Sequence, residues 1–486
     1  LNMPLILPGN VGSATAATGF NVSNSARFNS ASSDYLNRTP SSASNRDLWS
    51  ISAWVKRSNL GVYSTIYGVF TDSNNQENFG FLNNDTFQWQ LYQSGGVVGQ
   101  LTTNRLFRDP SAWYHILGVY NSANGTAGNR MRLYVNGVEE TSFATDTNPS
   151  DGQDSLWNND TLHMLGSGGT ASGGDLFEGY MSEFVAVDGA ALSPTDVGEF
   201  DDDSGIWKPI DVSGLTFGTN GFYLQFKASG TSANASGMGA DTSGNTHHFS
   251  INNLTAVDQS IDTCTNNFAT MNPLDNFFAG AAFTEGNTTT SITTTTIESY
   301  NLSTIGVSSG KWYAECKVLT TSKNTHIGIV SEASKAVGDY IGIDASGYGY
   351  AGGTVGVGKK WNNGSQTSYA NNYTTNDIIG VAMDLDNNKI YFSKNGTFQN
   401  SGDPTSGATG TGAAFTITAP ASTPDGVYYF AGGKRSNDTV VLAWNFGSPP
   451  YAISSGNTDG DGFGNFEYAV PSGYFALCTK NLAEYG

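Results

Sequence analysis

Apolar and polar residues alternate along most of the chain, in short stretches bounded by Gly, Asn and Ser. Residues 49–57 (WSISAWVKR) place Ile51, Ala53 and Val55 on one face of an extended segment, and residues 86–93 (TFQWQLYQ) alternate in the same way. A period of two is the pattern of a β-strand with one face in a core, whereas an amphipathic helix repeats every 3.6 residues. The chain therefore has to be built mainly from strands.

Turn residues between these stretches predict antiparallel pairing. Asn136-Gly137 follows a strand-like stretch and is the dipeptide that type I′ hairpins favour. Residues 377–396 contain two further alternating stretches separated by Asn387-Asn388. The best helix candidate is short, residues 191–200, with Ser193 as N-cap before Pro194.

The fold class that follows is all-β, with two antiparallel β-sandwiches joined by a Gly/Ser/Thr-rich segment. Shifts in composition set the expected boundaries: an N-terminal arm over residues 1–19, a first sandwich over 20–205, a connecting β segment and linker over 206–299, a second sandwich over 300–450, and a C-terminal extension over 451–486.

The charge balance excludes several classes of partner. The chain has 42 acidic and 22 basic residues, a formal charge of −20, which repels phosphate. We therefore expect no nucleic-acid binding and no attraction to anionic lipid. We also expect no membrane insertion, because no apolar run approaches the roughly 20 residues that span a bilayer. Three cysteines are too few for a disulfide framework, and Cys316 is expected to be a buried thiol.

Two segments resemble known domain families. Residues from about 20 to 205 resemble a laminin-G-like, concanavalin A-type jelly roll, through SISAWVKR, WYHILGVY, MRLYVNGVEE and FEGYMSEFVAVDGAALSPTDV in that order. Residues from about 300 to 447 resemble a SPRY domain, through GKWYAEC, IGIV, GDYIGI, DIIGVAMDLDNNKIYFSKNG and WNFG. These resemblances imply a concanavalin A-like sandwich followed by a SPRY-like one.

The combination, with MPLILPGN at the front and GYFALCTKNL near the end, resembles structural proteins of bacteriophages and other aquatic viruses. The resemblance implies a non-enzymatic virion protein: a head or tail fibre or appendage on the particle surface. It would bind host-surface glycans or neighbouring virion subunits, as a homo-oligomer such as a trimer. A secreted microbial carbohydrate-binding or adhesion protein built from the same modules is the alternative.

Catalytic motifs are absent or lack their context, so we expect no enzyme. Concanavalin-type glucanases place several acids at alternate positions of one strand, but no E-x-D-x-E occurs here. Glu183 and Glu315 are single acids that we expect on solvated faces. GVSSG (306–310) precedes a strand, where a nucleophile elbow needs a helix, and the Gly-rich GYGYAG (347–352) is interpreted as a mobile loop.

One candidate binding site is a set of aromatic residues in the Gly- and Asn-rich segment 346–373. Sugars stack on exposed aromatic rings, and function often lies on loops above a rigid sandwich. The alternative is that these rings cover the edge of their own core. The candidate carbohydrate-binding residues are Tyr348, Tyr350, Trp361, Tyr369 and Tyr373.

The other candidate is a calcium loop in NTDGDGFGNFE (457–467). Asn457, Asp459 and Asp461 have the spacing of the first ligands of an EF-hand. The acid that should close the loop, Glu467, comes one position early, and no helices are expected on either side. A surface turn without a metal is the alternative.

Overall fold

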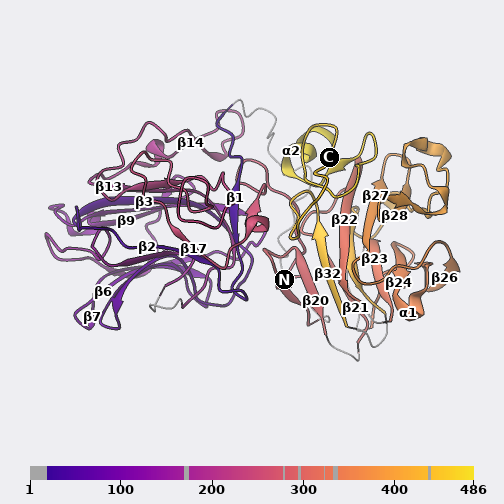
Figure 1. The fold of residues 1–486 in the computed structure, drawn as a ribbon, viewed down its shortest axis with the longest axis horizontal. Coiled ribbons are helices and arrows are strands. Elements are labelled where there is room, and N and C mark those ends of the chain that lie inside the picture. The colour runs from indigo at the N-terminus through magenta and orange to yellow at the C-terminus, as the bar shows by residue number, and fades with distance from the viewer. Residues whose placement is uncertain are drawn as a thin grey trace. The chain divides into compact units, whose positions relative to one another are not determined.

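In the computed structural model, the two halves of the chain fold as separate units. The structure describes residues 19–168, 174–276, 280–293, 297–321, 323–331, 338–435 and 439–486. One unit ends at Thr265 and the other begins at Asn266. Figure 1 shows the first sandwich in indigo to magenta and the second in orange to yellow. The expected N-terminal arm, residues 1–19, lies outside the described residues except for Gly19.

Within its described residues, the first sandwich packs two eight-stranded antiparallel sheets against each other. The back sheet runs β10(Val138–Glu139), β9(Met131–Val135), β8(Trp113–Asn121), β3(Leu48–Arg57), β13(Gly179–Asp188), β1(Ser25–Phe28) and β18(Gln259–Ser260), with β16(Phe222–Leu224) also on β13. The front sheet runs β11(Phe143–Thr147), β7(Gly96–Leu106), β6(Thr86–Gln93), β5(Asn75–Phe81), β4(Ser64–Asp72), β12(Leu162–Leu165), β2(Tyr35–Arg38) and β17(Ser250–Asn252).

The core between these sheets has the faces that the alternation predicts. Ile51, Ala53 and Val55 of β3 are buried in it, and the alternate residues of β6 meet them from the front sheet. The hairpin from β9 to β10 turns at Asn136 and Gly137, whose φ angles of 48° and 77° are those of a type I′ turn. The expected short helix is a single 3₁₀ turn, Pro194–Asp196, capped by Ser193.

Residues 206–265 are an integral part of the first sandwich, so the expected boundary at residue 205 is wrong. The β16, β17 and β18 strands pair with β13, β2 and β1, which closes both sheets. The same segment covers the outer face of the back sheet, where the Lys56 ammonium lies 2.8 Å from the Asp262 carboxylate. The prediction failed because these strands are only two or three residues long and are separated by Gly/Ser-rich stretches, so the segment has the composition of a linker.

Within its described residues, the second sandwich also has two sheets, which are antiparallel except for one short parallel pairing. The larger runs β19(Ala282–Thr284), β20(Thr289–Ile292), β32(Val440–Asn445), β22(Lys311–Thr320), β27(Ile378–Asp384), β28(Lys389–Lys394) and β29(Thr397–Phe398), with β30(Phe415–Thr416) on β28 and β33(Phe475–Ala476) on β22. The smaller runs β21(Ser299–Leu302), β31(Tyr429–Lys434), β23(Thr325–Val330), β24(Gly347–Gly352), β25(Lys359–Asn362) and β26(Ser365–Ser368).

The expected C-terminal extension also belongs to this sandwich. The β33 strand runs parallel to β22, and helix α2(Thr479–Tyr485) buries Leu482 in the core. Residues 266–299 enter here too, since Ala269 N–H donates to the Leu477 carbonyl and β20 pairs with β32. The described part of the segment 206–299 is therefore divided between the sandwiches at residue 265.

The Gly-rich residues 347–352 form the buried strand β24 and not a loop. Its glycines allow close packing: a Cβ on Gly352 would lie 2.4 Å from the ring of Tyr373. Glycine inside a strand often marks such a close approach. A short helix, α1(Gly353–Gly356), follows this strand. Among the described residues, no helix has the length and apolar character needed to cross a membrane.

Candidate functional site

The candidate aromatic residues are buried in the second sandwich: Tyr348, Tyr350 and Tyr373 lie in its core, and Trp361 lies in a separate small cluster with Tyr340 and Ala351. Tyr348, Tyr350, Trp361 and Tyr373 have exposed fractions of 3%, 0%, 4% and 0%, and Tyr369 is partly buried against the same core. A sugar stacks on the open face of a ring. The expectation of an exposed aromatic surface is therefore wrong, and the alternative, in which the rings cover their own core, describes the structure.

Contacts within the core account for the arrangement of these rings. The Tyr350 ring packs edge-on against Tyr373 with 4.8 Å between centroids. The Tyr373 hydroxyl donates to the Thr325 carbonyl oxygen at 2.8 Å. The guanidinium of Arg435 lies 4.5 Å from the centroid of Trp361. These groups hold the smaller sheet together and leave no stacking platform.

Asp459, the central carboxylate of the candidate calcium loop, is already saturated by hydrogen-bond donors. One carboxylate oxygen of Asp459 accepts the backbone N–H of Asp461 and of Phe463, at 3.0 and 2.9 Å. The other oxygen accepts Ala476 N–H at 2.9 Å and Asn481 Nδ2–H at 2.8 Å. A calcium ligand needs its lone pairs free for the ion. The donors around Asp459 therefore do not fit a calcium site.

The two other candidate ligands are also engaged. The Asp461 carboxylate accepts the Tyr485 hydroxyl at 2.8 Å. The amide of Asn457 donates to the carbonyls of Phe466 and Glu467. Among the described residues, no group of three or more His, Cys, Asp or Glu side chains is placed to hold a metal.

We therefore expect calcium to have no effect on the stability of the second sandwich. Its melting temperature should stay the same in millimolar CaCl₂ and in EDTA, because no carboxylate in the loop gains or loses a ligand. Differential scanning calorimetry of the full chain measures this. A calcium-dependent rise that Asp459→Asn abolishes would contradict it.

The acids expected on solvated faces are buried. Burial raises the pKa of Glu315 to about 7. The backbone N–H groups of Glu467 and Tyr468, which donate to its carboxylate, act in the opposite direction but are outweighed. Burial likewise raises the pKa of Glu183 to about 7 and outweighs the hydrogen bond from the Tyr223 hydroxyl, which lowers it. Both carboxylates act as internal anchors, and neither is part of an exposed acid pair.

Two buried groups give the second sandwich opposite responses to pH. A carboxyl whose pKa rises to about 7 on folding, as in Glu315, stabilises the fold below pH 4.5 and loses this contribution as the pH rises to 7. Burial lowers the pKa of His326 to about 4, so this group destabilises the fold as the pH falls below 6.5. The two contributions offset each other between pH 6.5 and 5.

We therefore expect His326→Gln to reveal the pH-dependent contribution of Glu315 to stability. Between pH 8 and pH 5, the second sandwich of this variant should gain on the order of 3 kcal/mol of unfolding free energy. Urea denaturation at several pH values measures the gain, and the double variant His326→Gln/Glu315→Gln is the control that should lack it. An equal gain in the double variant would exclude Glu315 as its source.

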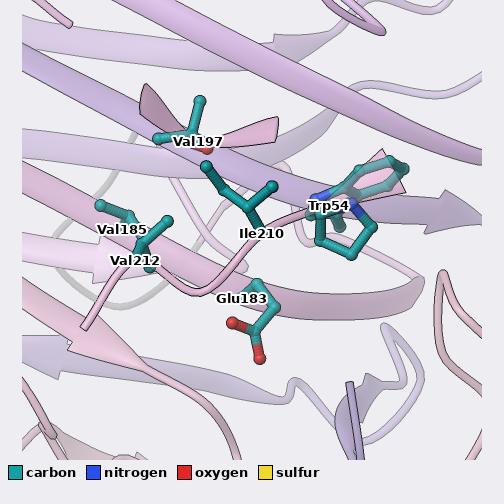
Figure 2. Close-up of a pocket in the computed structure, with 8 residues that line it drawn as sticks. Trp54, Glu183, Val185, Val197, Ile210 and Val212 are labelled. Carbon is teal, nitrogen blue, oxygen red and sulfur yellow. The ribbon is translucent and has the colours of Figure 1, made fainter. Parts of the chain in front are cut away.

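A small pocket lies where residues 197–212 cover the back sheet (Figure 2). Its volume is about 200 Å³, counted with the solvent at its mouth, and its lining residues are Ser52, Trp54, Glu183, Val185, Val197, Pro209, Ile210 and Val212. Ligand pockets usually enclose about 300–1,000 Å³. Figure 2 shows the Glu183 carboxylate turned away from Val197 and Ile210. The pocket is too small to hold a sugar.

A hydroxyl–imidazole pair lies beside this pocket. The Ser52 Oγ is 2.8 Å from the His115 Nε2, a distance that nucleophilic hydrolases use. Burial lowers the pKa of His115 to about 3, and its Nδ1 has no hydrogen-bond partner among the described residues. A catalytic histidine needs an acceptor at that nitrogen to orient it and to stabilise its charged form. We interpret the pair as part of the packing.

The outer face of the front sheet carries a ladder of amides. Gln90 Nε2 donates to Gln100 Oε1 at 2.7 Å, and Gln88 Nε2 and Gln100 Nε2 both donate to Thr102 Oγ1, at 3.3 and 3.0 Å. The three glutamines are half-buried on the face opposite the core. We call Gln88, Gln90, Gln100 and Thr102 the amide ladder.

Only two members of the amide ladder, Gln88 and Gln90, belong to the polar half of the alternation in residues 86–93. They do not indicate a site by themselves, because glutamine on a strand is also an ordinary solvent-facing residue. The alignment of β6 with β7, which brings Gln90 opposite Gln100, depends on bulges in this strand pair. The sequence pattern does not show them.

Family models match one part of each sandwich. Residues 30–198 match the concanavalin A-like lectin/glucanases superfamily, and residues 311–423 match the SPRY domain. A curated relative, the ATP-dependent RNA helicase DDX1 of Xenopus laevis, is 33% identical over 128 residues, which are 26% of this chain and 16% of that protein. The chain thus spans about a sixth of the length of that relative.

Two solved structures are similar to parts of the chain. The SPRY domain of human HERC1 is 18% identical, covers 32% of this chain and 87% of that one, and has a TM-score of 0.25. The heptameric SAP-like pentraxin of Limulus polyphemus is 15% identical, covers 36% and 81%, and has a TM-score of 0.28. By its family matches and its two antiparallel sandwiches, the chain contains a concanavalin A-like (laminin G) domain followed by a SPRY domain.

Proposed function

We propose that this chain is a non-enzymatic binding protein whose first sandwich binds glycans across the amide ladder. Each glutamine amide offers both an N–H donor and a carbonyl acceptor. Sugar hydroxyls need both kinds of partner, and neutral amides meet that need without a charge. The two matched domain families suggest binding roles for the chain as a whole.

The contrast between the two outer faces of the first sandwich carries this proposal. On the back sheet, Ser50, Ser52 and Lys56 are buried under residues 189–265. On the front sheet, Gln88, Gln90 and Gln100 stay partly exposed. A ligand can reach the polar side chains of the front sheet without unfolding part of the chain.

The absence of enzymatic activity is part of the proposal. The buried acids Glu77, Glu183 and Glu315 are engaged by internal donors. The Ser52–His115 pair has no third member among the described residues. Both observations support binding without turnover.

A glycan array on the recombinant chain tests the proposal, with the same wells assayed for released sugar. We expect binding without release. The double variant Gln90→Ala/Gln100→Ala should lose at least about tenfold in affinity, because each lost hydrogen bond contributes about 1 kcal/mol. Gln366→Ala, on the exposed edge strand β26 of the other sandwich, is the matched control. Equal binding by both variants would overturn the role of the ladder.

We further propose that the chain is a virion protein, a phage head or tail fibre or appendage on the particle surface. The segments MPLILPGN and GYFALCTKNL resemble those of structural proteins of bacteriophages and other aquatic viruses, and this resemblance supports the role. The SPRY domain would then hold a neighbouring subunit, and a homo-oligomer such as a trimer would multiply weak glycan contacts. Mass spectrometry of purified particles tests it. Absence from particles, with a secretion signal in the complete gene, would favour a secreted adhesion protein.

A further inference from the structure

One row of the amide ladder extends across four strands of the front sheet. Gln90 lies directly opposite Gln100 of β7 on one side and Asn78 of β5 on the other. Gln100 in turn lies opposite Thr147 of β11, the strand at the edge of the sheet. Directly opposite residues on paired strands share a face. Because neighbouring strands lie about 4.8 Å apart, the row from Thr147 to Asn78 is about 14 Å long, room for a few sugar units.

This row ends against another backbone segment. Gly68 is the residue of β4 opposite Asn78, and a Cβ added to it would lie 2.9 Å from the Gly168 Cα. A Cβ on Gly168 would lie 2.5 Å from Asn78 Oδ1 and 2.8 Å from the Thr65 side chain. Glycine inside a strand often marks such a close approach. Residues 167–168 therefore cross over β4 immediately beyond Asn78, and the polar row cannot continue.

The second row of the ladder ends at the same place. Gln88 lies opposite Thr102 of β7 on one side and Gly80 of β5 on the other. A Cβ on Gly80 would lie 2.7 Å from the Cα of Thr65, where β4 has an irregularity in its pairing with β5. Both rows are therefore open toward the sheet edge at β11 and closed beyond β5.

Backbone hydrogen bonds hold the closed end in place. Gly168 and Gly174 each donate to the carbonyl oxygen of the other, at 2.8 and 2.9 Å. Thr65 N–H donates to the Asp175 carbonyl oxygen at 2.7 Å. The segment that crosses the sheet is thus tied both to itself and to β4. We call residues 64–65, 167–168 and 174–175 the front-sheet wall.

Asn78, the last residue of the first row, has an unused donor. The three glutamines of the ladder donate to each other or to Thr102. Asn78 is half-buried: its Oδ1 is covered, and its Nδ2 donates to no group among the described residues. An amide nitrogen of this kind can donate to the oxygen of a sugar hydroxyl. The free donor therefore lies beside the front-sheet wall, where a chain running along the row has to stop.

The charge of this face favours an uncharged ligand. Residues 58–104, which include β4, β5 and β6, contain no Lys or Arg. Arg105, near the end of β7, is paired with Glu140 at 2.7 Å. A sulfated or carboxylated sugar would find no free cation in these strands, and the net charge of −20 would repel it.

We propose that the amide ladder receives the free end of a neutral glycan chain, whose terminal unit stops at the front-sheet wall and bonds to Asn78. The rest of the chain lies along the two rows and leaves the sheet over β11. A glycan bound through its interior would have to continue past Asn78, where the wall stands. This inference rests on the proposed function, glycan binding at the ladder, and adds which part of a glycan is bound.

Isothermal titration calorimetry on the full chain tests the proposal with three neutral polymers. The probes are α-1,6-glucan, β-1,3-glucan and α-1,6-mannan, each as the trisaccharide and as a long, soluble, unbranched chain. For a polymer that binds, we expect one protein molecule per long chain and the same Kd per chain as for the trisaccharide. A site for chain interiors would instead take several protein molecules on each long chain.

A variant at the closed end tests the place of the terminal unit. Asn78→Ala should weaken binding of the trisaccharide about fivefold, the effect of one lost hydrogen bond. Gln76→Ala is the matched control and should bind like the unmodified chain. Gln76 is half-buried on the same face of the same strand, but it lies opposite Tyr92, outside both rows.

The failure of this inference is distinguishable from the failure of the ladder. Several protein molecules on each long chain, or equal Kd values for Asn78→Ala and Gln76→Ala, would overturn recognition of the chain end. If Gln90→Ala/Gln100→Ala still weakens binding in that case, the ladder remains a glycan site. Binding of none of the probes, or binding that Gln90→Ala/Gln100→Ala leaves unchanged, would overturn the proposed function and this inference together.

Discussion

Replacing Asp262 by Ala is expected to lower the free energy of unfolding of the first sandwich by about 3–5 kcal/mol. The Asp262 carboxylate lies 2.8 Å from the Lys56 ammonium, and both side chains are 1% exposed. It also accepts the Trp113 Nε1–H at 3.2 Å. The substitution removes the carboxylate and leaves a buried cation that water cannot reach. Urea denaturation measures the loss, with hydrogen exchange of β3 and β22 amides to separate the two sandwiches.

Two controls separate the buried charge from a general effect of losing an acid. Asp154→Asn removes an ion pair with Arg46 in which the Asp154 side chain is 54% exposed, and it should cost less than about 1 kcal/mol. Lys56→Met/Asp262→Leu removes both buried charges and should recover most of the stability. If Asp262→Ala costs no more than Asp154→Asn, the pair does not anchor the segment that ends at residue 265.

The Lys56–Asp262 pair also shows why the domain boundary was mispredicted. Residue 56 belongs to a strand that the alternation identified, and its inner face was assigned correctly because successive side chains on a regular strand point to opposite faces. Its outer face was expected to be polar surface. The residues that cover that face come more than 130 positions later, in a segment whose composition resembles a linker. Local pattern identifies which face is apolar and does not reveal what covers the polar one.

Glycine and lone acids misled the site prediction for related reasons. Gly349 and Gly352 suggested a loop, but their missing side chains allow Ile341 and Tyr373 to pack against β24. The close approach at Gly352 lets Tyr373 pack against Tyr350 inside the core. In the same way, a lone Glu on a strand is usually solvated. Whether it is buried depends on distant backbone donors, and those of Glu315 lie about 150 residues along the chain.

Glu315→Ala is expected to release the C-terminal segment 451–486 from the second sandwich. The Glu315 carboxylate accepts the backbone N–H groups of Glu467 and Tyr468 at 2.9 and 2.8 Å, and the Asn445 amide at 3.4 Å. The Asn445 donor is buried and the two backbone donors are partly buried, so each one left without an acceptor costs about 1–3 kcal/mol. We expect a loss of about 3 kcal/mol and an increase of about 100-fold in the hydrogen-exchange rate of the Glu467 and Tyr468 amides. Amide exchange followed by mass spectrometry measures the local part of this effect.

The control for this prediction lies on the same segment. The Glu467 carboxylate is largely solvated and bonds to Ser454, so Glu467→Gln should change stability by less than about 1 kcal/mol and leave exchange at Tyr468 unchanged. Glu315→Gln keeps one acceptor oxygen, so its loss of stability should lie between those of Glu315→Ala and Glu467→Gln. If Glu315→Ala speeds exchange throughout the second sandwich equally, the segment unfolds together with the core. If it speeds exchange only in residues 451–486, Glu315 and Asp459 act as separate anchors, and the tail can open while the sandwich stays folded. Exchange at the Glu467 and Tyr468 amides that stays as slow as in the unmodified chain would contradict the anchoring role.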